Sequence, residues 1–175
     1  AAPRVLGEDH VAGPADVALA AAGFELQEAR GEEDQLPARR GVPAVVSTGC
    51  LDMVNFGPPE TVPAKFAGRN FYQHNPQVTL MRTTPEENAQ LGKVIAEKLN
   101  LSTGPVTVLL PLRGGSVISA PGGPFHDAAA DAALFSALKA GLRTDIPVRG
   151  LDRNVNDPEF AEACANALLA LLKRP

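Results

Sequence analysis

The chain has 175 residues, is 45% hydrophobic and carries a formal net charge of -4. This length fits one domain with a real core, and the acidic balance excludes a general nucleic-acid binder, which needs a basic surface. No apolar run is as long as about 18 residues, the length needed to span a membrane. The chain does not begin with the pattern of a signal peptide. We therefore expect a cytoplasmic protein without a membrane partner. Because the sequence begins at Ala1 without Met, we expect a processed or truncated chain, or one piece of a longer protein.

Cysteine and histidine positions give no sign of a metal site. The two cysteines, Cys50 and Cys164, lack paired metal-type spacing, and the three histidines are also scattered. Cys164 lies on the apolar stripe of a predicted helix, so we expect a buried thiol. We predict neither a metal nor a disulfide framework.

Residues 1–40 give the weakest pattern. An Ala-rich segment over 17–24 predicts a short helix, and the charged segment that follows contains Pro37, which ends a helix. From residue 41 the pattern sharpens, because VPAVVS over 42–47 is typical of a buried strand. We treat 1–40 as a poorly defined segment and 41–175 as one α/β domain.

The next elements are separated by loops rich in glycine and proline. The glycines and prolines of residues 48–70 predict one long connection, and we expect a short strand over 70–74 after it. Thr84, Pro85 and Glu87 form a capping box that opens a helix. The remaining predicted elements are, in chain order, a helix over 85–100, a strand over 105–110, a helix over 128–140 capped by Asp127, a strand over 146–151 and a helix from 158. This alternation of strands and helices predicts a parallel sheet covered by helices.

Three polar segments are candidates for a binding site. Ligands of open parallel sheets bind beyond the carboxyl ends of the strands, where glycines admit a ligand and arginine grips phosphate or carboxylate. The helix N-terminus at Thr84 also attracts anions. The candidate ligand-binding residues are Gly49, Asp52, Asn55, His74, Asn75, Arg82, Thr83, Thr84, Arg113, Gly114, Gly115 and Ser116. The alternative for each is an ordinary turn, cap or ion pair. For the three segments to form one binding site, Asp52, Arg82 and Arg113 must lie close together at one edge of the sheet.

The same segments carry a family resemblance. GCLDMVNFG from Gly49, HNPQVTLMRTTPEEN from His74 and PLRG from Pro111 are similar to the UPF0261 family, also called the Tm-1-like ATP-binding domain family. The similarity spans about residues 41–173. It implies a Rossmann-like (flavodoxin-like) C-terminal subdomain with helices on both faces of a parallel sheet. It also implies nucleotide binding with ATP and accompanying Mg²⁺ as candidate ligands, a homo-oligomer, and an N-terminal partner subdomain.

Three functions remain open from the sequence. The leading hypothesis is a domain that binds a nucleotide or a small phosphate ligand. The second is an enzyme acting on a small carboxylate or phosphoester, with His74 or Asp52 as acid or base. The third is a self-association or protein-interaction module. No reaction can be assigned from these residues.

Overall fold

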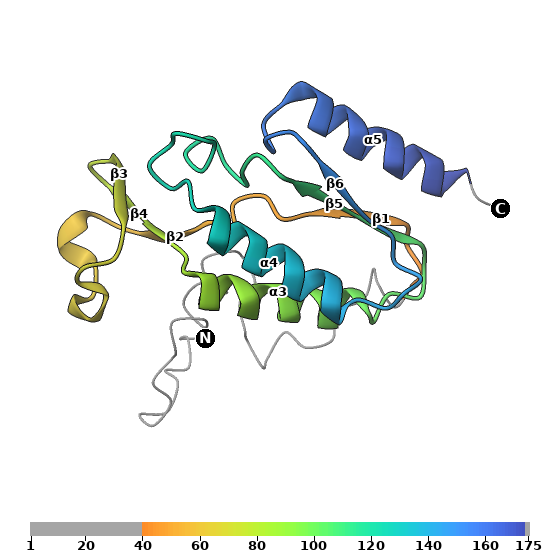
Figure 1. Ribbon diagram of the computed structural model, residues 1–175, viewed down its shortest axis with the longest axis horizontal. Coiled ribbons are helices and arrows are strands. Elements are labelled where there is room, and N and C mark those ends of the chain that lie inside the picture. Colours follow the sequence, from red (N-terminus) through yellow and green to blue (C-terminus); the bar gives the residue numbers. More distant parts are fainter. Residues whose placement is uncertain (1–39, 174–175) are drawn as a thin grey trace, which may run out of the picture.

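A three-stranded parallel sheet forms the centre of the molecule (Figure 1). The computed structural model describes residues 40–173, so the helix expected over 17–24 lies outside the described residues. The strands run in the order β1-β5-β6, with bounds β1 Ala44–Ser47, β5 Val106–Pro111 and β6 Val148–Leu151. All six residues of β5 are buried, as expected for the middle strand of a sheet covered on both faces.

Three helices cover this sheet. Helices α3 (Pro85–Leu99) and α4 (Ala128–Gly141) lie together on one face, and α5 (Pro158–Leu172) lies on the other (Figure 1). The capping box predicted at Thr84 is confirmed, as is the Asp127 cap, whose side chain accepts from the Ala130 N–H. The expectation of an α/β domain with helices on both faces of a parallel sheet is confirmed.

A second, antiparallel sheet was not predicted. Its strands are β2 Met53–Phe56, β3 Phe71–Asn75 and β4 Val78–Arg82, in the order β2-β4-β3. The prediction of one long connection over 48–70 is therefore wrong. That segment holds β2 and two 3₁₀ turns, Pro59–Thr61 and Ala64–Phe66. Pairing with β4 decides the outcome, because four residues of β2 have too little local signal to form a strand alone.

The main core joins both sheets to α3 and α4. Its buried members include Val54 and Met81 from the antiparallel sheet, Val108 and Leu110 from β5, and Leu91 from α3. A Cβ added at Gly92 would lie 2.6 Å from the Leu134 carbonyl oxygen, so α3 and α4 pack backbone to backbone. This close approach fixes α4, and with it the loop that precedes it.

Helix α5 buries less of its surface than its sequence predicts. Phe160 and Leu171 are buried and Cys164 is half-buried. Leu168, one turn after Cys164, is 36% exposed and lies beside the exposed Leu169 and Leu172, so the apolar stripe expected for this helix is not buried along its whole length. Within residues 40–173, no helix has the length and apolar character needed to span a bilayer.

Candidate functional site

Loops that follow all three parallel strands meet at the carboxyl edge of the sheet. The Cys50 N–H, after β1, donates a 2.8 Å hydrogen bond to the Gly115 carbonyl, after β5. From the loop after β6, Asn154 Nδ2 donates to the carbonyls of Arg113 and Ser116 at 3.0 and 2.8 Å. Such an edge is where open α/β sheets bind ligands, and here its loops are fixed to one another.

A buried carboxylate lies at the centre of this edge. The Ser116 hydroxyl donates a 2.5 Å hydrogen bond to Asp52 Oδ2, and both side chains are buried. Asp52 Oδ1 is also buried but has no hydrogen-bond partner among the described residues. A Cβ on Gly115 would lie 3.5 Å from this oxygen and 3.2 Å from the Thr48 carbonyl oxygen. Asp52 and Ser116 thus tie two loops together from inside the edge.

Arg82 joins the candidate segments but lies beneath the surface. Its guanidinium donates to the carbonyls of Phe125, Asp52 and Asp127, to the Thr83 hydroxyl and, at 2.6 Å, to Asp131 Oδ1. These five bonds use all five N–H groups of the side chain. Arg82 therefore has no N–H left for a phosphate, and it acts here by holding the loops in place.

The N-terminus of α3 already has an internal anion. Glu87 Oε2 accepts from the Thr84 N–H at 2.8 Å and from Arg69 at 2.7 Å. The Thr83 hydroxyl is buried and donates to the Leu51 carbonyl. Glu87 therefore occupies the position in which an outside anion would bind, and it accepts the hydrogen bonds that this helix end offers to an anion.

Arg113 lies on the outer side of the edge. Its side chain is 53% exposed, and its nearest carboxylate, Asp152 Oδ1, is 3.5 Å from Nη1. That distance exceeds an ordinary N–H···O hydrogen bond, so the guanidinium keeps its donors for another acceptor. Arg153, from the loop after β6, is also about half exposed and lies 4.0 Å from Glu159. Sequence reasoning missed Arg153, although its place just after a strand was the available signal.

Three other predicted residues belong to the antiparallel sheet. His74 and Asn75 are exposed near the end of β3, and Asn55 is exposed on β2. Asn75 Oδ1 accepts from the Gln77 N–H, which is a local turn contact. No hydrogen bond or ion pair of the described residues joins these side chains to Asp52 or Arg113, so the structure does not bring them into the central edge.

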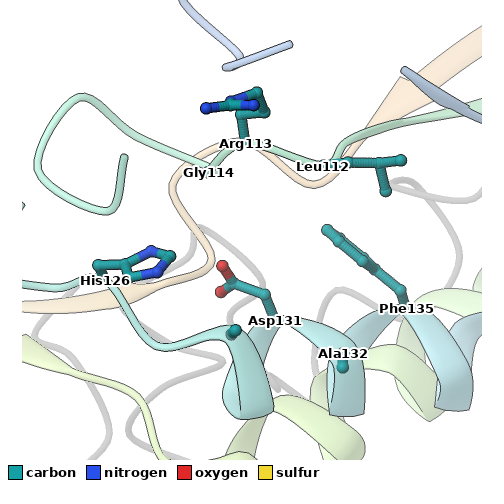
Figure 2. A pocket seen from close by; sticks show the side chains of 8 residues that line it. Leu112, Arg113, Gly114, His126, Asp131, Ala132 and Phe135 are labelled. Carbon is teal, nitrogen blue, oxygen red and sulfur yellow. The ribbon is translucent and has the colours of Figure 1, made fainter. Parts of the chain in front are cut away.

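A pocket of about 200 Å³ opens on the other side of the Arg113 loop (Figure 2). Figure 2 shows His126 and Asp131 at one end and Leu112 and Phe135 at the other, with the Arg113 guanidinium turned away from the cavity. Burial raises the pKa of Asp131, and this effect outweighs the opposing influence of Arg82. Neither Asp131 nor His126 is among the candidate residues named from the sequence.

Cys50 has an unusual backbone for a residue with a side chain. Its φ is 58°, in the left-handed region that favours glycine. Burial, followed by the nearby Asp52 carboxylate, raises the pKa of its thiol. The described residues contain no group of three or more His, Cys, Asp or Glu side chains placed to hold a metal ion.

Comparison with known proteins identifies the family. Residues 23–172 match the model described as "Uncharacterised protein family (UPF0261) C-terminal domain", starting upstream of residue 41 where the sequence motifs begin. A UPF0261 protein of Rhizobium meliloti is 54% identical over 132 residues, which are 74% of this chain and 33% of that protein. A UPF0261 protein of Clostridium tetani is 48% identical over 77% of this chain and 33% of its own length.

A plant protein is also similar. The ToMV resistance protein Tm-1(GCR237) of Solanum lycopersicum is 43% identical over 74% of this chain and 18% of its own length. The chain thus spans about a third of the bacterial relatives and less of the plant protein. From the range of the family match and these identities, the chain belongs to the UPF0261 family and matches its C-terminal domain.

Proposed function

We propose that this domain binds a small phosphate-bearing ligand at the carboxyl edge of the β1-β5-β6 sheet. Arg113 carries the proposal, because its guanidinium is exposed and its ion pair with Asp152 is long, at 3.5 Å. Hydrogen bonds hold its loop to both neighbouring loops. Arg113 would supply charge and paired donors to a phosphate. Gly114 and Gly115 allow this loop to pack closely, because a Cβ would lie 2.9 Å from Asn154 Nδ2 at Gly114 and 3.2 Å from the Thr48 carbonyl oxygen at Gly115. The Rossmann-like arrangement implied by the resemblance would place a ligand at this edge.

The other predicted residues have supporting parts in this proposal. Asp52 and Ser116 would hold the Arg113 loop from inside, and Arg82 would hold the Asp52 turn. None of these three side chains needs to touch the ligand. Binding would therefore depend on Arg113 for direct contact and on the others for the position of its loop.

ATP is the nucleotide suggested by the resemblance. The pocket of about 200 Å³ lies on the other side of the loop from the Arg113 guanidinium (Figure 2), so it does not enclose a ligand bound there. A nucleoside triphosphate would therefore contact this edge through part of its structure, most simply through one phosphate at Arg113. Within the described part of the chain, no group of carboxylates near Arg113 forms a Mg²⁺ cage, so Mg²⁺ would arrive held by the phosphates.

Calorimetric titration tests this function. Inorganic phosphate, ATP and small phosphorylated acids should bind the wild type, and Arg113→Ala should lower their affinity at least tenfold. Lys93→Ala, which removes an exposed charge from α3, is the matched control and should bind normally. No heat with any of these ligands, or equal affinity in Arg113→Ala, would refute the proposal.

Exposed leucines on α5 favour a second candidate, self-association. Leu168, Leu169 and Leu172 form an i, i+1, i+4 group on the outer side of the C-terminal half of the helix. Clustered exposed apolar side chains mark interaction surfaces. Light scattering should then show a dimer that Leu169→Glu dissociates. A wild-type monomer at all concentrations would count against this candidate.

A further inference from the structure

The pocket between the Arg113 loop and α4 has one polar end and one apolar end. Figure 2 shows the Asp131 carboxylate and the His126 ring facing each other at the first end. Leu112 and Phe135 lie at the second end, and Ala132 lines the floor between them. A ligand that fits this pocket has a polar group at one end of a compact apolar body.

The carboxylate at the polar end is held rigidly. Asp131 Oδ1 accepts a 2.6 Å hydrogen bond from Arg82 Nη2, and Arg82 is itself buried and fixed by four further bonds. Asp131 is only 18% exposed. Its second oxygen, Oδ2, accepts no hydrogen bond from the described residues and is not sealed from solvent. An acceptor that is already in position adds little ordering cost when a donor binds.

Local charge selects the kind of donor. The carboxylates of Asp52 and Asp127 lie close enough to disfavour ionisation of Asp131, while the Arg82 guanidinium favours it. The three carboxylates outnumber the Arg82 guanidinium, with which only Asp131 forms an ion pair, so this end of the pocket is acidic. A positively charged donor relieves that imbalance, whereas a neutral hydroxyl does not.

His126 can accept a second N–H from the same donor. Its Nδ1 lies 3.4 Å from the Ser119 carbonyl oxygen, a position in which a hydrogen on Nδ1 points to that oxygen. The tautomer with this hydrogen keeps Nε2 as an acceptor. A primary ammonium has three N–H groups and can serve both Asp131 Oδ2 and His126 Nε2.

We propose that this pocket binds a small molecule with a primary ammonium group on a compact apolar body. The ammonium would contact Asp131 and His126, and the apolar body would lie against Leu112, Ala132 and Phe135. Arg113 is among the residues that line this pocket, but its guanidinium is turned away from the cavity (Figure 2), so the site differs from the one proposed for phosphate. It does not depend on the function proposed above.

Benzylamine is a suitable probe, with benzyl alcohol as its uncharged counterpart. Two-dimensional NMR titration of the ¹⁵N-labelled chain at neutral pH measures both affinities. We expect benzylamine to shift the amide signals of residues 112–114 and 128–135, and to bind at least tenfold more tightly than benzyl alcohol. Affinity should fall as acidification protonates Asp131, since the carboxyl group then loses its charge; Arg82, Asp52 and Asp127 are the charged groups that influence it, and Arg113 also lines the pocket.

Two variants separate binding from folding. Asp131→Asn removes the charge but also leaves Arg82 without its carboxylate partner, so it risks the fold. Ala132→Leu keeps that ion pair and fills the pocket floor from an exposed helix position. Both variants should lower benzylamine affinity at least tenfold, and Asp152→Asn, on the other side of the loop, should not.

Three results would overturn the assignment. They are equal affinity for benzylamine and benzyl alcohol, unchanged benzylamine binding in Ala132→Leu, and no binding of benzylamine by the wild type. Each leaves the phosphate titrations with Arg113→Ala unaffected, so the two proposals can fail independently.

Discussion

The Ser116 hydroxyl hydrogen-bonds to Asp52 across 64 positions of sequence, joining the loop after β5 to the loop after β1. The Ser116 hydroxyl and N–H also contact the Ser119 hydroxyl, so the bond lies inside a tight turn. A short hydrogen bond from a hydroxyl to a buried carboxylate is of the stronger, charge-assisted kind. The position of the Arg113 loop therefore depends on a pair that is out of a ligand's reach.

Removing the Ser116 hydroxyl should weaken the fold. Ser116→Ala leaves both carboxylate oxygens of Asp52 buried without a donor, which costs about 1–3 kcal/mol. Urea unfolding followed by circular dichroism measures the change in the free energy of unfolding. Ser136→Ala, at an exposed position of α4, should change it by less than about 0.5 kcal/mol. Equal stability of the two variants would show that the Asp52 bond contributes nothing.

Two arginines should respond very differently to the same substitution. Arg82→Met leaves Asp131 and several carbonyls without donors, and breaking a buried ion pair costs about 3–5 kcal/mol. Arg113→Met removes only an exposed, long ion pair, which is worth about 0–1 kcal/mol. Thermal unfolding of both variants separates the roles. The assignment fails if Arg113→Met is the less stable protein.

The contact between α3 and α4 should not tolerate a methyl group. In Gly92→Ala the added carbon would lie 2.6 Å from the Leu134 carbonyl oxygen and 2.9 Å from Ala137 Cβ. Both neighbours belong to a packed helix, so we expect a loss of about 1–3 kcal/mol from overpacking. Gln90→Ala, two residues earlier and exposed, is the control. A stabilised Gly92→Ala variant, as helix propensity alone predicts, would contradict the close packing.

The Cys50 thiol should react slowly near neutral pH although it is exposed. The residue is exposed, but its thiol group is partly buried. This burial and then the Asp52 charge raise the pKa of the thiol, so less thiolate is present than in a free cysteine. In a Cys164→Ser background, Asp52→Asn should speed alkylation by iodoacetamide at mildly alkaline pH, because it removes the charge but not the burial. A rate that Asp52→Asn leaves unchanged would exclude electrostatic control by this carboxylate.

Local sequence signals predict the parallel half of the fold well. The capping box at Thr84, the Asp127 cap and the apolar run of β5 each depend on a few adjacent residues. The antiparallel sheet was missed because β2 and β4 are stabilised by each other, through pairs such as Val54 with Met81. Pairing between distant segments leaves no mark within either segment.

The arrangement of the candidate residues could be predicted only in part for the same reason. The sequence identified Asp52, Arg82 and Arg113, and the structure joins their segments at one edge. It did not reveal that Arg82 is buried, since four of its five acceptors belong to residues at least 30 positions away in the sequence, Asp52 and three residues within 125–131. Asp131 was missed because it lies within an Ala-rich helix and becomes notable only through Arg82 and the pocket.

Mapping phosphate binding by NMR tests the central claim most directly. Titration of inorganic phosphate into the ¹⁵N-labelled chain should shift the amide signals of 49–50, 113–116 and 153–156 together, with one dissociation constant. Arg113→Met should abolish these shifts. Shifts confined to the His74–Asn75 hairpin or to the start of α3, or no shifts at all, would contradict a ligand site at the carboxyl edge.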